Sequence, residues 1–313
     1  MRRVDVTADT DEWLAERRRY VMASDAPAVM GLSSWQTPLD VWHAKNGQEQ
    51  PFPEMLGWLG HRMEPVIADW LRRFHPELGQ IRRGFMAVSE EWPWLGATLD
   101  RVQQRTGNPI ELKTANRHVI RKWLGEGGDV VVPTDYRVQV QTQLAVTGRS
   151  RAFVAVALGG SDFELVEEPR DDEFIRDHLV PRTREFWELV RDGVMPPPAT
   201  LAEQAQTWPT EKGKTVEASA TAVEMAERWA VLRSDLAAQE AEADALKKAL
   251  GEYMGDANVL TVNGEPVVRL RTQQGRKTVS VADLEAADPE LASELVKQSA
   301  PFKVMTWARK DKK

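Results

Sequence analysis

Residues 94–114, WLGATLDRVQQRTGNPIELKT, contain two short apolar runs that predict β-strands. The turn formers at 106–109 separate the runs and predict a hairpin, which would bring Asp100 close to Glu111. The side chains of Glu111 and Lys113 would point to one face of their strand, because successive strand residues alternate. Charged groups on such a face are costly in a protein core unless chemistry uses them.

Two carboxylates and a lysine in this arrangement suit phosphodiester chemistry. Asp100 and Glu111 could share a hard cation such as Mg²⁺, with Mn²⁺ as the alternative ion. Lys113 would lie beside the metal, where it could orient a water molecule or stabilise the transition state. The pattern of Asp, a loop and Glu-x-Lys resembles the active site of the PD-(D/E)XK nucleases. The alternative interpretation is a solvated hairpin with an ion pair between its strands.

Composition narrows the class of protein. The chain has 313 residues, of which 42% are hydrophobic and 28% charged, so it is large enough for one large core or two smaller ones. It contains no cysteine, which excludes disulfides, thiolate zinc sites and iron–sulfur clusters. It has no run of eighteen apolar residues, and its first residues lack the apolar segment of a signal peptide. We therefore expect a soluble protein in the cytoplasm of a bacterial host cell.

The net charge of −7 is unevenly distributed along the chain. Residues 1–150 hold 19 basic and 19 acidic residues, whereas residues 151–313 hold 22 basic and 29 acidic residues. The basic residues of the first half occur in clusters at 17–19, 72–73, 82–83 and 121–122. These clusters could line a groove for phosphates, or they could simply be solvated surface.

Helix signals surround the central stretch. We expect helices over 9–19 with a cap at Asp9, from Ser24 to Gly31, over 37–46, 55–74, 117–125 and 134–148, and over 171–190 with a break at Pro181. For Ser24, capping its helix is a sufficient role by itself. Glu64 lies on or beside the apolar stripe of the 55–74 helix, where either a metal or a neighbouring arginine would serve as its partner.

Further strands are predicted at 80–88, 151–158 and 161–168. Residues 80–88 should begin the sheet that continues through the two strands of the central stretch. Gln139, Gln141 and Gln143 stand out in the 134–148 helix, because glutamine can donate hydrogen bonds without adding charge. Alternatively, one or two of these glutamines face solvent.

Taken together, these motifs resemble the phage lambda exonuclease family in its YqaJ-type viral recombinase branch. The matching pieces occur in the family's order over residues 13–148: Trp13-x3-Arg17-x6-Ser24, Gly60-x3-Glu64, Thr98-Leu99-Asp100, Glu111-Leu112-Lys113 and Tyr136-x2-Gln139-Val140-Gln141. Leu99 stands where the family has proline, a departure that concerns backbone rigidity more than chemistry.

The resemblance assigns roles to these positions. Asp100 and Glu111 would hold the metal with the backbone carbonyl of Leu112, and Glu64 would hold it directly or through water. Lys113 would position the attacking water. Two glutamines, Gln139 and less directly Gln141, would assist in the same site. A terminal 5′-phosphate would be held by Arg17, Ser24 and Thr98.

By the same resemblance, the chain would be a Mg²⁺-dependent exonuclease that degrades one strand of double-stranded DNA from its 5′ end. The 3′ overhang would then serve a single-strand annealing protein, and a ring of three subunits would surround the DNA. Two alternatives stay open: an endonuclease of the PD-(D/E)XK type that is restriction-like or structure-specific, and a non-catalytic DNA-binding scaffold. An endonuclease would cut a closed circle, whereas a scaffold would bind DNA without cutting it.

The implied fold is α+β, with a central mixed sheet flanked by helices as in restriction endonucleases. We expect this nuclease core over 1–195, a linker over 196–214 and an accessory region over 215–313. In the accessory region, apolar residues at alternating spacings of four and three predict one long helix with a heptad seam that needs a partner. An Asn263-Gly264 hairpin, two short helical pieces and a last strand over 302–310 should follow. The basic residues of this region would bind DNA or form a solvated surface; they are Arg269, Arg271, Arg276, Lys277, Arg309, Lys310, Lys312 and Lys313.

Overall fold

The computed structural model describes residues 1–8, 10–48, 54–116, 119–125, 127–211, 213–272, 274–275 and 280–296. The chain divides into two compact units, Met1–Ala199 and Thr200–Lys313, so the first unit extends four residues beyond the expected boundary at 195. The expected cap at Asp9, the expected strand over 302–310 and six of the basic residues named above lie outside the described residues; the six are Arg276, Lys277, Arg309, Lys310, Lys312 and Lys313.

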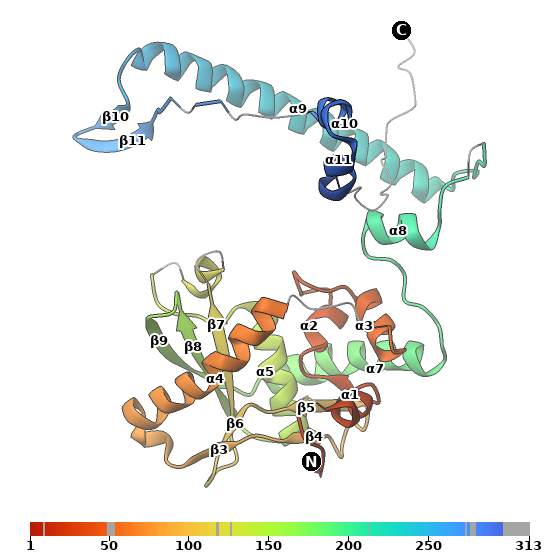
Figure 1. Ribbon diagram of the computed structural model, residues 1–313. Helices are drawn as coiled ribbons and strands as arrows, with labels where there is room; N and C mark the ends of the chain where they lie inside the picture. Colours follow the sequence, from red (N-terminus) through yellow and green to blue (C-terminus); the bar gives the residue numbers. More distant parts are fainter. Residues whose placement is uncertain are drawn as a thin grey trace. The chain divides into compact units, whose positions relative to one another are not determined.

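A five-stranded mixed sheet forms the centre of the first unit (Figure 1). Its strands, in spatial order, are β3 (Ile81–Arg83), β6 (Arg101–Gln103), β7 (Pro109–Ala115), β8 (Arg151–Leu158) and β9 (Asp162–Pro169). The central pair β7 and β8 is parallel, and the other neighbouring pairs are antiparallel. The hairpin predicted at 106–109 joins β6 to β7 and is confirmed.

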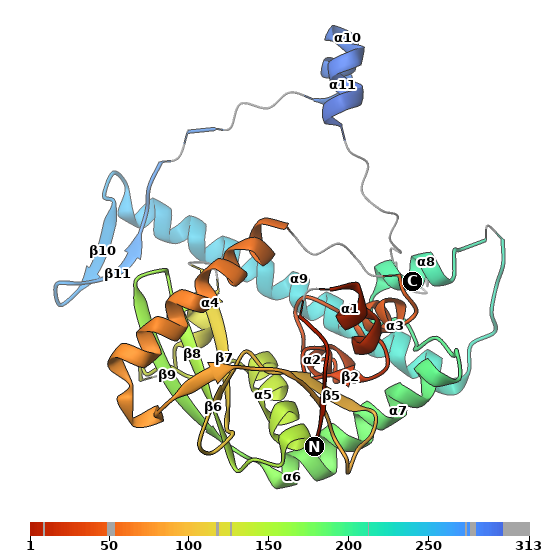
Figure 2. The same ribbon diagram turned by 60° about the horizontal axis from the view of Figure 1, so that its bottom comes forward.

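Helices cover both faces of this sheet. The long helix α4 (Glu54–Phe74) packs through Ile67 and Leu71 against apolar side chains of β7 and β8. On the other face, α5 (Thr134–Thr147) packs through Val140 and Leu144 against Val154 and Val156 of β8. The expected α+β class, a mixed sheet flanked by helices, is therefore confirmed (Figures 1 and 2).

A second, four-stranded sheet lies in the same unit. Its strands, in spatial order, are β1 (Arg2–Val4), β4 (Met86–Val88), β5 (Leu95–Thr98) and β2 (Val21–Met22). The prediction of one strand over 80–88 was wrong, because β3 and β4 belong to different sheets. The first run of the central stretch is divided in the same way, into β5 and β6, so that the chain passes from one sheet to the other at Leu99 and Asp100.

The remaining helices of the first unit begin near the predicted signals, except for a 3₁₀ turn at Pro76–Leu78 that was not predicted. They are α1 (Asp11–Arg17), α2 (Ala26–Val29), α3 (Pro38–Lys45), η1 (Pro76–Leu78), η2 (Ile120–Trp123), α6 (Asp172–Phe174), η3 (Ile175–Leu179) and α7 (Val180–Arg191). Thr10 caps α1 by accepting from the Trp13 N–H, and α2 has no side-chain cap. Of the expected helix over 117–125, the described residues 119–125 contain only the short 3₁₀ turn η2.

The break expected at Pro181 takes the form of a π-helical turn. Proline lacks the N–H that would bond to the carbonyl four residues earlier, and its ring collides with that carbonyl. The backbone responds by widening into the π-helical segment η3 immediately before α7.

The second unit consists of α8 (Leu201–Thr207), α9 (Ala220–Met254), β10 (Val259–Val262), β11 (Glu265–Arg269), α10 (Val281–Ala287) and α11 (Pro289–Leu295). The segment 196–214 expected to be a linker thus contains a helix, α8. The long helix, the hairpin and the two short helices are confirmed. Asn263 and Gly264 both have positive φ, at 53° and 85°, as a two-residue hairpin turn requires.

Met254 is the one buried residue of α9, and heptad-seam positions such as Met225, Leu236 and Leu246 are exposed. Within the described part of the chain, no helix is both long enough and apolar enough to cross a membrane.

Candidate active site

Asp100 lies where the chain leaves one sheet and enters the other. The Asp100 carbonyl accepts from Gly84 N–H at 3.0 Å, and the neighbouring Leu99 N–H donates to Phe85 carbonyl at 3.1 Å. A side chain at Gly84 would place its Cβ 1.8 Å from the Leu99 carbonyl oxygen, so only glycine fits this close approach. These contacts fix the backbone, and the Asp100 carboxylate accepts from Leu112 N–H at 2.8 Å.

Glu111 and Lys113 project from β7 toward α5, as the alternation of strand residues predicts. The Lys113 ammonium lies 2.7 Å from the Glu111 carboxylate. Because the Leu112 N–H binds the Asp100 carboxylate, both acidic groups lie within the same few residues of β7. The hairpin therefore brings together the three residues that the sequence predicts at the centre of the site.

Two glutamines of α5 complete the cluster. Gln139 accepts from the Lys113 ammonium at 3.1 Å and donates to one Glu111 oxygen at 2.7 Å. Gln143, one helical turn later, donates to the other Glu111 oxygen at 2.5 Å and is fully buried. Side chains four residues apart share a helix face, which explains why both reach Glu111.

Gln141 has different partners from those predicted. Its amide nitrogen donates to the Pro169 carbonyl at 2.7 Å, and its amide oxygen accepts from Asp171 N–H at 2.9 Å. Residues two apart on a helix do not share a face, so Gln141 cannot join Gln139 at Glu111. The structure gives this place to Gln143, which sequence reasoning noticed but did not assign; the spacing of four from Gln139 is the signal that identifies it.

Burial and repulsion shift the protonation equilibria in the cluster. Burial raises the pKa of Asp100 well above its ordinary value, and the negative charge of Glu111 raises it further, against the opposing effect of Lys113. Burial by itself would lower the pKa of Lys113, but the charges of Glu111 and Asp100 outweigh it and raise that pKa. Lys113 therefore carries its charge at neutral pH, between two acidic groups that repel each other.

An aromatic stack supports the lysine. The Lys113 ammonium lies 4.7 Å from the centre of the Tyr136 ring, and Tyr136 stacks on Trp123 with ring centres 5.3 Å apart. Trp123 is completely buried. A cation over an aromatic face is attracted to it, so Tyr136 restrains the position of Lys113 in addition to its ion pair with Glu111.

Glu64 approaches the cluster from α4. Its carboxylate lies 3.6 Å from Arg101 and 3.5 Å from His61, and its negative charge contributes to the raised pKa of Asp100. Among the described residues, no three His, Asp or Glu side chains form a ready-made metal-binding group. The donor set nevertheless fits a hard cation, because the half-buried carboxylate of Asp100 and the buried carboxylate of Glu111 have only one ammonium group between them.

The residues expected to hold a 5′-phosphate gather at the ends of β2 and β5. An Arg17 guanidinium nitrogen donates to the Ser24 hydroxyl at 3.0 Å, and the guanidinium lies 4.4 Å from the centre of the Trp13 ring. Ser24 and Thr98 each lie two residues beyond the paired positions Met22 and Gly96 of these parallel strands. The Thr98 hydroxyl is buried and has no hydrogen-bond partner among the residues that the structure describes.

Comparison with known proteins shows which families and structures this chain resembles. Residues 12–150 match the YqaJ-like viral recombinase domain, which confirms the resemblance expected from the sequence for this part of the chain. The chain is also similar to a protein called YqaJ from Bacillus subtilis (strain 168), with 29% identity over 260 residues, 79% of this chain and 79% of that protein.

Among solved structures, an alkaline exonuclease from Laribacter hongkongensis aligns with 59% of this chain and 94% of its own, at 20% identity and a TM-score of 0.49. A phage-related exonuclease from Haemophilus somnus 129PT aligns with 56% of this chain and 96% of its own, at 10% identity and a TM-score of 0.42.

Proposed function

We propose that this chain, which carries a YqaJ-like viral recombinase domain over residues 12–150, is a metal-dependent exonuclease that degrades one strand of duplex DNA from its 5′ end. The observation that carries the proposal is the convergence of Asp100, Glu111 and Lys113 with Gln139 in one largely buried cluster. A solvated hairpin with an ion pair between its strands would not bury Glu111, which is only 2% exposed.

Asp100, Glu111 and the Leu112 carbonyl would hold Mg²⁺, or Mn²⁺ in its place, with Glu64 as a further ligand directly or through water. The cation supplies Lewis acidity, which neutralises phosphate charge and makes a bound water more acidic. Gln139 and Gln143 donate to both oxygens of Glu111, so this carboxylate is held in one orientation without a competing positive charge from the glutamines.

Lys113 has two functions in this account. Its positive charge can stabilise the negative charge that grows on the phosphate in the transition state, and its N–H groups can orient the attacking water. Contact with Gln139 on one side and with the Tyr136 ring on the other holds the ammonium in place before substrate arrives. A group positioned in advance does not have to reorganise during the reaction.

Selection of a strand end would come from Arg17, Ser24 and the unpartnered Thr98 hydroxyl. A guanidinium with two hydroxyls matches the donors that a terminal phosphate accepts. Lys45 supports this region: its ammonium is 2.5 Å from Asp25 and donates to the Arg17 carbonyl at 3.0 Å. The proposed phosphate-binding role of these residues is what favours an exonuclease over an endonuclease with the same catalytic cluster.

The 3′ overhang produced would be the substrate of a single-strand annealing protein. The chain carries a net charge of −7, which reduces its general attraction for DNA. A ring of three subunits around the duplex would keep the enzyme on its substrate without strong electrostatic binding, so we propose that assembly as well. Sedimentation in the presence and absence of duplex DNA would test it, and a monomer in both conditions would contradict the ring.

The function is tested with two substrates of one sequence: a linear duplex carrying 5′-phosphate on one strand only, and a covalently closed circle. With Mg²⁺, we expect loss of the 5′-phosphorylated strand and an intact circle. Cutting of the circle would instead support the endonuclease. Binding of the linear duplex without cleavage of either substrate would support the non-catalytic scaffold.

A further inference from the structure

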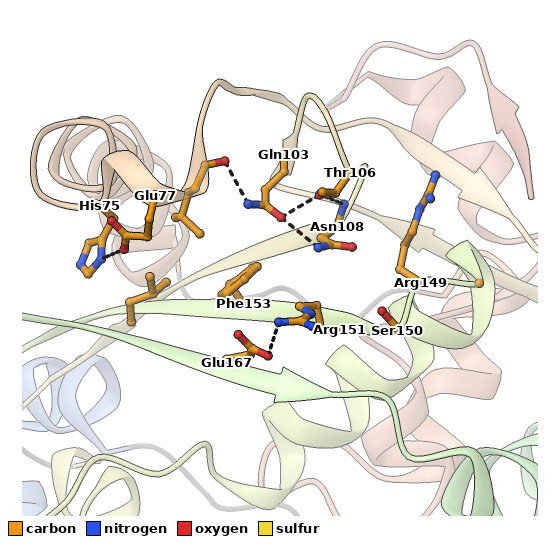
Figure 3. Close-up of a pocket in the computed structure, with 13 residues that line it drawn as sticks. His75, Glu77, Gln103, Thr106, Asn108, Arg149, Ser150, Arg151, Phe153 and Glu167 are labelled. Atoms are coloured by element: carbon orange, nitrogen blue, oxygen red, sulfur yellow. Dashed lines mark hydrogen bonds and ion pairs between the residues drawn. The ribbon is translucent and has the colours of Figure 1, made fainter.

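A pocket of about 890 Å³ lies at one end of the five-stranded sheet (Figure 3). The turn between β6 and β7, the turn between α5 and β8, and the residues that follow α4 meet around it. Its lining residue Phe153 faces α4, whereas the Glu111 side chain faces α5. The pocket therefore opens on the other face of the sheet and shares no residue with the catalytic cluster.

Arg149, in this lining, carries a charge that the described residues leave uncompensated. Its Nε atom is buried and has no hydrogen-bond partner, and the guanidinium forms no ion pair within the described part of the chain. The group lies against the backbone of Gly107, where an added Cβ would be 2.9 Å from an Arg149 nitrogen. Gly107 also has a φ of +73°, and this conformation favours glycine at the position.

The other charges near the pocket already have partners. Glu167 is paired with Arg151 at 2.8 Å, and the Glu77 carboxylate lies 2.7 Å from His75. The C-terminal end of α5 carries a partial negative charge that attracts cations. Arg170 already lies there and donates a hydrogen bond to the Leu144 carbonyl. The Arg149 guanidinium thus has no ion-pair partner among the described residues and can bind an anion. Ser150, the next residue in the chain, also lines the pocket and has a hydroxyl that can donate.

The remaining walls suit a flat organic group rather than a bare ion. Leu78, Phe153 and Leu165 provide an apolar wall. Across from it, the Asn108 amide nitrogen donates to Gln103 at 2.9 Å, which leaves the amide oxygen of Asn108 as an acceptor. Gln103 is itself fixed by its hydrogen bond to the Leu78 carbonyl at 2.9 Å, so the orientation of Asn108 is set in advance.

We propose that this pocket binds a nucleotide. Arg149 and Ser150 hold its phosphate, the apolar wall contacts its base, and the Asn108 oxygen accepts from an N–H on the edge of that base. A free mononucleotide and a nucleotide within a DNA strand share this chemistry, and the test below distinguishes the two sources. The inference goes beyond the proposed function and does not depend on cleavage.

Binding is measured by titration calorimetry of 5′-dGMP into the full chain, with chelator present so that no cleavage occurs. We expect one binding event whose affinity falls about tenfold or more in Arg149→Gln, as for removal of a charge-assisted hydrogen bond. Binding of the 5′-phosphate at Arg17 and Ser24 would be a second event, which Arg149→Gln leaves unchanged. Arg182→Gln is the matched control: this exposed arginine lies on α7 and pairs with Glu185, so dGMP affinity should not change. Lys113→Ala should also leave dGMP affinity unchanged, which would place the binding outside the catalytic cluster.

Inorganic phosphate and deoxyguanosine, titrated separately, should each bind more weakly than dGMP. A six-nucleotide single strand then identifies the source: competition with dGMP indicates a nucleotide within a strand, and its absence indicates a free nucleotide. The proposal is overturned if dGMP does not bind, if Arg149→Gln binds it normally, if Lys113→Ala loses it, or if phosphate alone binds equally well. Nuclease activity of Arg149→Gln is measured in parallel and should equal that of the unaltered chain, so either proposal can fail without the other.

Discussion

Gly84 shows how one small residue determines the position of Asp100. The two backbone segments at this point approach so closely that a Cβ at residue 84 would lie 1.8 Å from the Leu99 carbonyl oxygen and 3.0 Å from the Asp100 carbonyl carbon. Both atoms belong to the backbone and cannot rotate away. Any side chain at 84 must therefore displace the segment that carries Asp100.

Gly84→Ala should lower the free energy of unfolding by about 1–3 kcal/mol, the usual cost of overpacking a core. Gly60→Ala is the matched control, because an added Cβ at this helical position in α4 meets nothing within 4 Å. The control should raise the free energy of unfolding by about 0.5–1 kcal/mol, since alanine favours helix over glycine. Urea denaturation measures both, and equal stabilities for the two variants would contradict the close approach.

We expect Gln143 to act as a positioning residue, because it donates a hydrogen bond to Glu111. Gln143→Leu removes the donor to one Glu111 oxygen and should weaken Mn²⁺ binding about 10- to 100-fold, as loss of a group that orients a metal ligand does. Gln141→Leu is the control: an equally buried glutamine whose partners are Pro169 and Asp171. It should unfold at a lower temperature but keep its Mn²⁺ affinity. Calorimetric titration and thermal unfolding of both variants measure this, and equal Mn²⁺ affinities would remove Gln143 from the site.

At the scale of single residues, local pattern predicts that Asp100, Glu111 and Lys113 lie together, and the structure has them so. The positions of Asp100, Glu111 and Lys113 follow from a hairpin and from strand alternation, both of which are local. The choice between Gln141 and Gln143 depends on which face of α5 meets the sheet. Helical spacing limits that choice, but only packing against β7 and β9 decides it.

Single elements of the fold are less predictable where tertiary contacts interrupt them. The runs at 80–88 and 95–102 read as continuous strands, yet each is shared between two sheets. The division occurs at Gly84 in the first run and at Leu99–Asp100 in the second. The backbones of the two runs are hydrogen-bonded to each other at these points. Strand propensity does not predict which strand will pair with which. The second sheet therefore could not be predicted from the sequence.

Helix starts, by contrast, are specified by short signals. Thr37 accepts from Asp40 N–H at 3.2 Å while the Asp40 carboxylate accepts from Thr37 N–H at 2.9 Å, which completes a reciprocal cap for α3. Thr37→Ala should lower the free energy of unfolding by about 1 kcal/mol, whereas Thr37→Ser should preserve it. Urea denaturation of the two variants tests the cap, and an alanine variant as stable as the serine variant would count against it.

At the scale of the whole molecule, the residues of the candidate site all lie in the first of the two units. Asp100, Glu111, Lys113, Gln139 and Arg17 all belong to Met1–Ala199, together with the cores packed on both sheets. The second unit contributes few buried residues of its own, Met254 and Ala292 among those described. The first unit should therefore fold without it.

A chain ending at Ala199 should retain Mg²⁺-dependent cleavage of linear duplex within about tenfold of the full chain, one step of 1.4 kcal/mol in activation free energy. Circular dichroism establishes that the shortened chain is folded, and strand loss on a gel measures its rate. A folded fragment without activity would show that the second unit contributes to catalysis or to substrate capture.

We propose that Asp100, Glu111 and Lys113 form the catalytic centre. Single-turnover cleavage of 5′-phosphorylated linear duplex by Lys113→Ala tests it most directly, beside Lys248→Ala, an exposed lysine of α9. Loss of a group that stabilises transition-state charge should slow Lys113→Ala by about 10²–10³-fold while duplex binding persists. The control should cleave at the rate of the unaltered chain. Cleavage by Lys113→Ala at that same rate would contradict the account.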